Sequence, residues 1–199
     1  LENGEHIYAR TVVSNATRWN TFGGEGVKDP LIDINKIPKE EKQWQKRYKP
    51  SPSFLSIHLG VLENVIPKGF NCHHLIVESW DEMENDLGVI FISIPTILDK
   101  QLAPEGNHIV HIFSPSKIHV WDNLTSKEYI EKKRTISQKL ISKVEEILPG
   151  LNGAITFIES GSPKTHRRFL NRHQGSYGPI PANKLPGLLT MPFNSTKIK

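Results

Sequence analysis

Cysteine is almost absent from this chain of 199 residues, and long apolar runs are missing altogether. The single Cys72 cannot form an internal disulfide, and it excludes a metal site built from several cysteines. No stretch is apolar over enough residues to cross a bilayer as a helix. With 37% hydrophobic residues the chain can still bury a core, so the sequence favours a globular chain without disulfides.

The common signatures of catalysis and of nucleotide binding are also missing. The chain has no G-x-G-x-x-G and no Walker loop, so it carries no dinucleotide-binding fingerprint of its own. No G-x-S-x-G elbow is present, because Pro163 interrupts the one near match. Nine histidines occur without an H-E-x-x-H pair, so packing or surface histidines are favoured over a metal site. A net charge of +4 without lysines interleaved with aromatics does not indicate nucleic-acid binding.

One short stretch, residues 161–181, holds most of the chemically specific residues. It reads G-S-P-K-T-H-R-R-F-L-N-R-H-Q-G-S-Y-G-P-I-P. Its glycines and prolines predict an ordered loop near a site. The basic cluster from Lys164 to Arg168 is either a solvated turn or a phosphate contact, since arginine is a preferred partner of phosphate.

The remaining pattern predicts an α+β fold. Helices are expected to begin at Pro38 and to cover residues 127–148, where Thr125 and Glu128 have the spacing of a capping box. β-rich runs separated by glycine, proline and aspartate indicate a mainly antiparallel sheet with one face covered. The predicted strands are residues 9–16, 54–61, 73–78, 88–95, 107–113 and 154–159. Val12 and Val13 suggest that the first of these strands is buried on both faces.

The two ends of the sequence also carry an expectation. The chain begins with Leu1 instead of methionine, and it stops without a terminating element. We expect an internal or carboxyl-half fragment of a longer protein.

Seven motifs extend over essentially the whole chain. They are G-S-P-K-T-H-R-R-F-L-N-R at 161–172, G-S-Y-G-P-I-P at 175–181, G-L-L-T-M-P-F-N at 187–194, V-V-S-N-A-T-R-W at 12–19, S-P-S-F-L-S-I-H-L-G-V at 51–61, L-A-P-E-G at 102–106 and H-I-F at 111–113. Together they resemble the carotenoid isomerases, which belong to the phytoene-desaturase-like, FAD-dependent oxidoreductase and amine-oxidase superfamily.

The resemblance implies a two-domain flavoprotein whose substrate domain encloses an apolar tunnel. It implies that residues 1–22 return to the FAD-binding domain, that residues 23–160 form the substrate-binding domain, and that residues 161–199 lead back toward the flavin. The implied FAD contacts are Ser14, Asn15, Ala16, Tyr177 and Gly178. The implied substrate contacts are Asn171, Gly175 and Phe193. It assigns no catalytic residue and no metal.

The resemblance further implies a reaction and a location. Poly-cis-lycopene would become all-trans-lycopene with reduced FAD and without net redox change, at a cyanobacterial or plastid membrane that the protein contacts peripherally. The fragment alone should be inactive and should hold FAD poorly. Apolar residues that could supply contacts to the polyene are Phe54, Ile57, Leu59, Phe91, Ile92, Ile112 and Phe113. Two alternatives remain: a carotenoid desaturase of the same fold, and a non-catalytic module that binds an apolar ligand.

Overall fold

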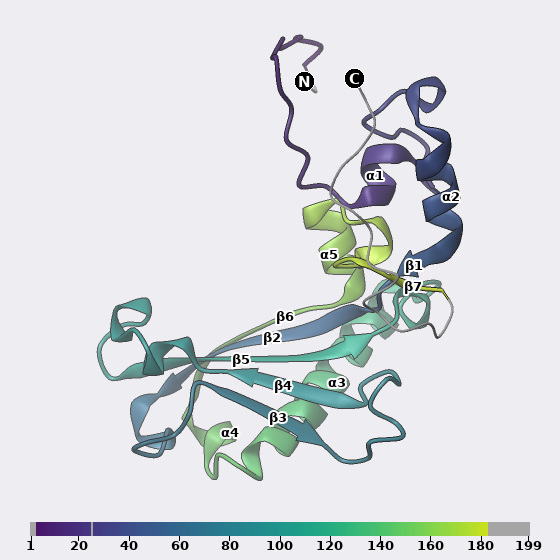
Figure 1. The fold of residues 1–199 in the computed structure, drawn as a ribbon. Helices are drawn as coiled ribbons and strands as arrows, with labels where there is room; N and C mark the ends of the chain where they lie inside the picture. The colour runs from purple at the N-terminus through teal and green to yellow at the C-terminus, as the bar shows by residue number, and fades with distance from the viewer. Residues whose placement is uncertain (1–2, 25, 183–199) are drawn as a thin grey trace. The chain divides into compact units, whose positions relative to one another are not determined.

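Figure 1 shows the computed structural model of the chain, which describes residues 3–24 and 26–182. Contacts between residues divide the chain into two compact units. The first unit comprises Leu1–Lys49 with Gly178–Lys199, and the second comprises Pro50–Tyr177. The functional division predicted at residues 22 and 160 stays a prediction.

The second unit is built on a five-stranded sheet in the order β3-β4-β5-β2-β6. Each of its paired neighbours runs antiparallel. The strands are β2 (Ser53–Leu62), β3 (His73–Val77), β4 (Val89–Ser93), β5 (Asn107–Ser116) and β6 (Ile155–Gly161). The connections between these strands contain the short 3-10 turns η2 (Glu63–Val65), η3 (Pro95–Ile97), η4 (Lys100–Leu102) and η5 (Ile118–Val120), and a further turn, η6 (His173–Gly175), lies beyond β6. The predicted α+β class with a mainly antiparallel sheet is confirmed.

One face of this sheet is buried under helix α3 (Ser126–Glu145). The helix begins with the predicted capping box, in which Thr125 and Glu128 each bond the other's backbone. Leu140, Ile141 and Val144 of α3 join the core residues of the central strands, and Figure 1 shows α3 passing behind the sheet. Beyond α3, Gly150 adopts a left-handed φ of 85° before α4 (Leu151–Ala154). The hydrophobic core of this unit therefore lies between α3, α4 and one sheet face.

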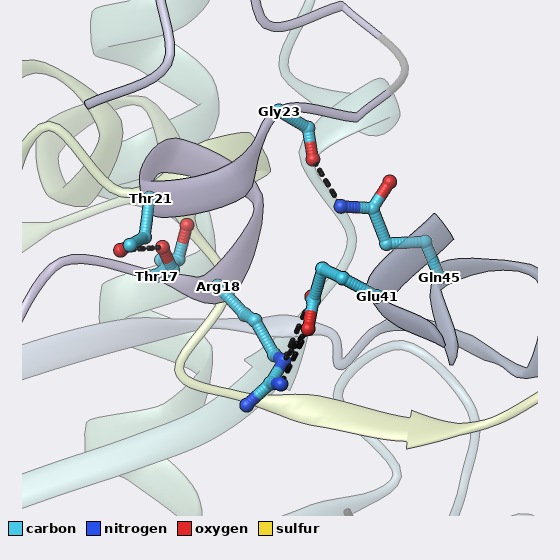
Figure 2. A network of polar contacts seen from close by, with 6 residues as sticks. All are labelled: Thr17, Arg18, Thr21, Gly23, Glu41 and Gln45. Atoms are coloured by element: carbon cyan, nitrogen blue, oxygen red, sulfur yellow. Dashed lines mark hydrogen bonds and ion pairs between the residues drawn. The ribbon is translucent and has the colours of Figure 1, made fainter. Parts of the chain in front are cut away.

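The first unit is smaller and is held by polar and aromatic contacts. It contains α1 (Arg18–Phe22), η1 (Ile34–Lys36), α2 (Lys39–Arg47), and β1 (Tyr48–Pro50) paired with β7 (Pro179–Pro181). Figure 2 shows Arg18 of α1 donating hydrogen bonds to both carboxylate oxygens of Glu41. Glu41 is only 6% exposed. The Arg18 guanidinium also lies over the Trp44 ring at 4.5 Å, and Gln45 donates to the Gly23 carbonyl at 2.6 Å. These contacts hold α1 against α2, because separating the helices would leave the buried Glu41 carboxylate without its partner, and a buried charge is tolerated only when it is paired.

The strand predicted over residues 9–16 is wrong. Val12 and Val13 are 83% and 89% exposed, and the segment forms no strand within the described residues. A strand needs a neighbour to bond its backbone groups. In the sheets formed by residues 3–24 and 26–182, no strand pairs with this segment. Two consecutive apolar residues such as Val12 and Val13 indicate a buried strand only when the fold supplies a neighbouring strand.

The loop predicted over residues 161–181 is also wrong in its first half. Pro163–Leu170 form helix α5, which Ser162 and Thr165 cap reciprocally. Pro163 stands at the first turn, where a missing N–H costs nothing. The helix ends at Asn171, whose φ is 47°. The basic residues of this stretch are therefore displayed on a helix, which fixes the direction of each side chain.

Candidate functional site

The sheet face opposite α3 carries a continuous row of aromatic side chains. Along β2, every second residue from Ser53 to Val61 is buried toward α3, so Phe54 points to the other face. Phe113 of β5 and Phe91 of β4 form a directly opposed pair, and their rings stack at 5.3 Å. The Phe54 ring lies 5.9 Å from Phe113 and 5.5 Å from Tyr177. Phe91, Phe113, Phe54 and Tyr177 are called the aromatic row below.

The aromatic row ends at a hydrogen-bonded pair. The Tyr177 hydroxyl lies 2.9 Å from Nδ1 of His166 on α5, and the Arg172 guanidinium lies 4.5 Å from the Tyr177 ring centroid. Burial lowers the pKa of His166, the Phe54 backbone opposes this, and the charges of His58 and Arg172 lower it further. The Tyr177 hydroxyl and Nδ1 of His166 share one hydrogen bond, in which either atom can be the donor depending on the tautomer of the neutral imidazole. Tyr177 is thus held in one orientation, although 43% of it is exposed.

Two further histidines lie on the same face of the sheet. His58 of β2 stands opposite His111 of β5 on one side and Glu159 of β6 on the other. The two imidazole centroids are 4.8 Å apart. Burial, followed by the charge of His58, lowers the pKa of His111. Among the described residues, no three His, Cys, Asp or Glu side chains come together as a metal site.

We predict that acid destabilises the second unit through His166 and His111. Because the pKa of His166 and that of His111 are lowered in the folded state, protonation favours the unfolded chain. Stability should therefore be complete above the ordinary histidine pKa of about 6.5 and should fall as the pH drops below it. Urea titrations on both sides of this pH should show a shallower pH dependence for His166→Gln than for the parent protein.

The matched control is His119→Gln, which changes an exposed histidine of η5. This variant should keep the pH dependence of the parent. An unchanged pH dependence in His166→Gln would contradict the burial of a neutral imidazole.

Comparison with known proteins identifies relatives over the whole chain. The chain is 49% identical to "Prolycopene isomerase, chloroplastic" of Daucus carota and 50% identical to the protein of that name in Arabidopsis thaliana. It is also 50% identical to "Prolycopene isomerase 2, chloroplastic" of an Oncidium hybrid cultivar. The chain is homologous to the prolycopene isomerases. It spans about a third of the length of these curated relatives, and no protein-family model matches it.

The match confirms the resemblance to carotenoid isomerases that the motifs predicted. All residues of the chain align with the prolycopene isomerases, so the aromatic row and the Tyr177–His166 pair lie within the homologous segment. Within residues 3–24 and 26–182, no helix is both long and apolar enough to span a membrane.

The predicted substrate residues fall in different places. Gly175 is buried with a φ of 67°, and an added Cβ would lie 2.6 Å from the Pro163 carbonyl oxygen. Asn171 is exposed at the end of α5. Both residues belong to the second unit together with Tyr177. Phe193 lies outside the described residues.

The predicted FAD residues are divided between the units. Ser14, Asn15 and Ala16 precede Thr17, the N-cap residue of α1, in the first unit, and the Ser14 hydroxyl lies 2.8 Å from that of Thr21. Asn15 and Ala16 are exposed. Tyr177 closes the second unit, and Gly178 follows in the first. Ser14 and Tyr177 are exposed as well, and the described residues contain no G-x-G-x-x-G turn.

The sequence alone did not indicate His166 as a site residue, because it is one of four basic residues between positions 164 and 168. Its partner Tyr177 is eleven positions away, and only the turn through η6 brings the two together. The candidate apolar contacts also separate by face. Ile57, Leu59, Ile92 and Ile112 are buried in the core at 0–2% exposure, whereas Phe54, Phe91 and Phe113 are half-buried on the opposite face of the sheet.

Proposed function

We propose that this chain forms the carotenoid-contacting part of a prolycopene isomerase, an enzyme that converts poly-cis-lycopene to all-trans-lycopene. The observation that carries the proposal is identity of about half over the complete chain to three proteins of that name. The aromatic row on the sheet face opposite α3 is the feature of the structure that supports it. Poly-cis-lycopene is a hydrocarbon, so a protein must hold it by apolar contact alone.

The aromatic row has the chemistry for such contact. Its rings follow one another at 5.3, 5.9 and 5.5 Å across β4, β5, β2 and Tyr177. Burial of apolar surface contributes roughly 25 cal/mol per Å². A polyene laid along the row would cover the three phenylalanines and exclude water from them. The Tyr177 hydroxyl, held by His166, would mark the polar end of this surface.

We propose reduced FAD as the cofactor, with Ser14, Asn15, Ala16, Tyr177 and Gly178 at its edge. Reduced flavin would supply the electron density that lowers the order of a double bond so that it can rotate, without net redox change. This chain's residues would orient the two partners. Asn171, Gly175 and Phe193 would lie next to the substrate. The assignment of residues 1–22 to the flavin side, 23–160 to the substrate and 161–199 to the return segment belongs to this proposal.

We also propose peripheral contact with a membrane, because a hydrocarbon substrate partitions into lipid. The relatives are named as chloroplastic, which supports a plastid membrane.

Expression in cells that accumulate poly-cis-lycopene tests the function. We expect a full-length protein that contains this chain to produce all-trans-lycopene, measured by chromatography of the extracted pigments, and we expect this chain alone to leave poly-cis-lycopene unchanged. Products with additional double bonds would contradict isomerisation and support a desaturase. Bound but unchanged poly-cis-lycopene would support a non-catalytic binding protein.

A substitution in the aromatic row tests the placement of the substrate. Phe113→Ala removes the central ring and should lower turnover at limiting substrate about tenfold, because roughly 1–2 kcal/mol of apolar contact is lost. Phe113→Leu should restore much of the rate, because it returns apolar volume. Trp80→Ala is the control, since Trp80 is 76% exposed and lies outside the row. Equal activity of the Phe113→Ala and Trp80→Ala variants would place the substrate elsewhere.

A further inference from the structure

Helices α3 and α5 enclose a surface pocket that the aromatic row does not use. Its volume is about 470 Å³. Tyr129 and Ile130 line it from α3, and Lys164, Arg168 and Phe169 line it from α5. These five residues, together with Arg167, are called the basic pocket below. Both helices belong to the second unit, so the pocket is a feature of one compact body.

The walls of the basic pocket carry a concentration of positive charge. The ammonium group of the lining residue Lys164 lies 5.4 Å from the Tyr129 ring centroid, and that of Lys133, which is not a lining residue, lies 5.7 Å from the same ring. Burial alone would raise the pKa of Tyr129, but hydrogen bonds with Ser162 and Thr165 and the two lysine charges outweigh it and lower that pKa. The pocket therefore favours negative charge.

Acidic side chains neutralise only part of this charge. Arg167 pairs with Asp122 at 3.2 Å, and both side chains are partly exposed. Within the described residues, neither Lys164 nor Arg168 forms an ion pair. The guanidinium of Arg168 instead lies 5.2 Å from the Phe169 ring centroid. Two cations thus remain available to an anionic partner.

Large apolar side chains adjoin these cations and face water. Phe169 is 72% exposed and Ile130 is 61% exposed, and both line the basic pocket. Leu170, the next residue of α5, is 54% exposed. Neighbouring exposed apolar side chains mark interaction surfaces. Phosphate-binding cations beside a projecting aromatic ring match the headgroup and acyl boundary of a bilayer, because one partner then satisfies both kinds of group.

We infer that the basic pocket docks the protein on an anionic membrane, with lipid phosphates at Lys164 and Arg168 and with Phe169 and Ile130 inserted beneath the headgroups. The inference locates the membrane contact that the proposed function includes, and it can be tested without isomerase activity. Its ligand is the bilayer surface, since a free phosphate ion would leave Phe169 and Ile130 in water.

Sedimentation with vesicles tests the inference. The purified protein should bind vesicles of phosphatidylcholine and phosphatidylglycerol in equal parts, and it should bind pure phosphatidylcholine weakly. The double variant Lys164→Gln/Arg168→Gln should partition about thirtyfold less, because each cation near an anionic surface contributes about a factor of five. Raising the ionic strength toward 1 M, where the Debye length is about 3 Å, should weaken binding of the parent protein. Phe169→Ser should also reduce binding, and this loss should persist at high salt.

The matched control is Lys100→Gln/Lys139→Gln, which removes equal charge from exposed sites outside the basic pocket. It should bind like the parent protein. If both double variants lost vesicle binding equally, net charge alone would explain the loss and the docking site would be overturned. Displacement from vesicles by inorganic phosphate at salt-matched ionic strength would overturn it in favour of a free anion. Unchanged binding of Phe169→Ser would exclude insertion. Circular dichroism should show the parent fold for all variants, because the changed side chains are surface groups.

Discussion

Replacement of Trp121 by alanine is expected to lower the free energy of unfolding by about 3–5 kcal/mol. Trp121 follows η5 and is 0% exposed. Its Nε1–H donates to the Ser116 hydroxyl at 2.8 Å, and its ring contacts Tyr129 edge-on at 5.9 Å. The indole therefore joins the end of β5 to α3. Truncation would leave both a cavity and an unpaired buried hydroxyl, since Ser116 is also 0% exposed.

Two controls separate these contributions. Trp121→Phe keeps much of the ring but removes the N–H donor, so its cost should be about 1–3 kcal/mol. Trp80→Ala removes an indole that is 76% exposed and should change stability by no more than about 0.5 kcal/mol. Urea unfolding followed by far-ultraviolet circular dichroism gives the three values. If Trp121→Ala cost no more than Trp80→Ala, Trp121 would not be a core residue.

Local signals were sufficient for most elements of the second unit. The capping box at Thr125 and Glu128 located the start of α3 to within one residue, because both interactions are made within one turn. The predicted end at residue 148 lies three residues beyond Glu145, since turn-like bonds to the Val144 carbonyl continue past the regular helix. The strands agree to within a few residues at each end, because glycine- and proline-rich turns separate them.

The faces of the sheet could not be read from the same signals. Phe54 and Ile57 both occur in an apolar strand pattern, but Phe54 is half-buried on the face opposite α3 and Ile57 is 0% exposed. The difference depends on where α3 packs, which is a long-range property. The same reason explains why residues 9–16 were predicted as a strand, since β-propensity depends on a neighbouring strand. The aromatic row likewise draws on three separate strands and Tyr177 and has no local signature.

Gly175 and Ser176, which lie between α5 and Tyr177, position the Tyr177 side chain in the candidate site. Ser176 is 0% exposed, and its hydroxyl lies 3.1 Å from that of Ser51. Gly175 precedes it and packs against the first turn of α5. The position of the Tyr177 ring next to Phe54 and His166 therefore depends on the backbone at Gly175. A glycine assigned to substrate contact by resemblance thus has a structural reason of its own.

We expect Gly175→Ala to lower the free energy of unfolding by about 2–4 kcal/mol. The φ of 67° disfavours any side chain, and the new Cβ would lie 2.6 Å from the Pro163 carbonyl oxygen and 3.0 Å from the Ser53 hydroxyl. Both neighbours are parts of the packed fold, and one is backbone, so the turn must move. Urea unfolding measures the loss of stability.

Gly106→Ala is the matched control, because Gly106 has a φ of 75° but no atom within 4 Å of an added Cβ. It should cost only the left-handed backbone strain of about 1–2 kcal/mol. The difference between the two variants isolates the collision at Pro163. If the turn places Tyr177, the Gly175→Ala variant should lose isomerisation activity together with stability. The contribution of His166 to the pH dependence of stability should also change, because the Tyr177 hydrogen bond is displaced. Full stability with lost isomerisation would mean that the glycine leaves room for the substrate instead, and it would contradict the structural role assigned to Gly175.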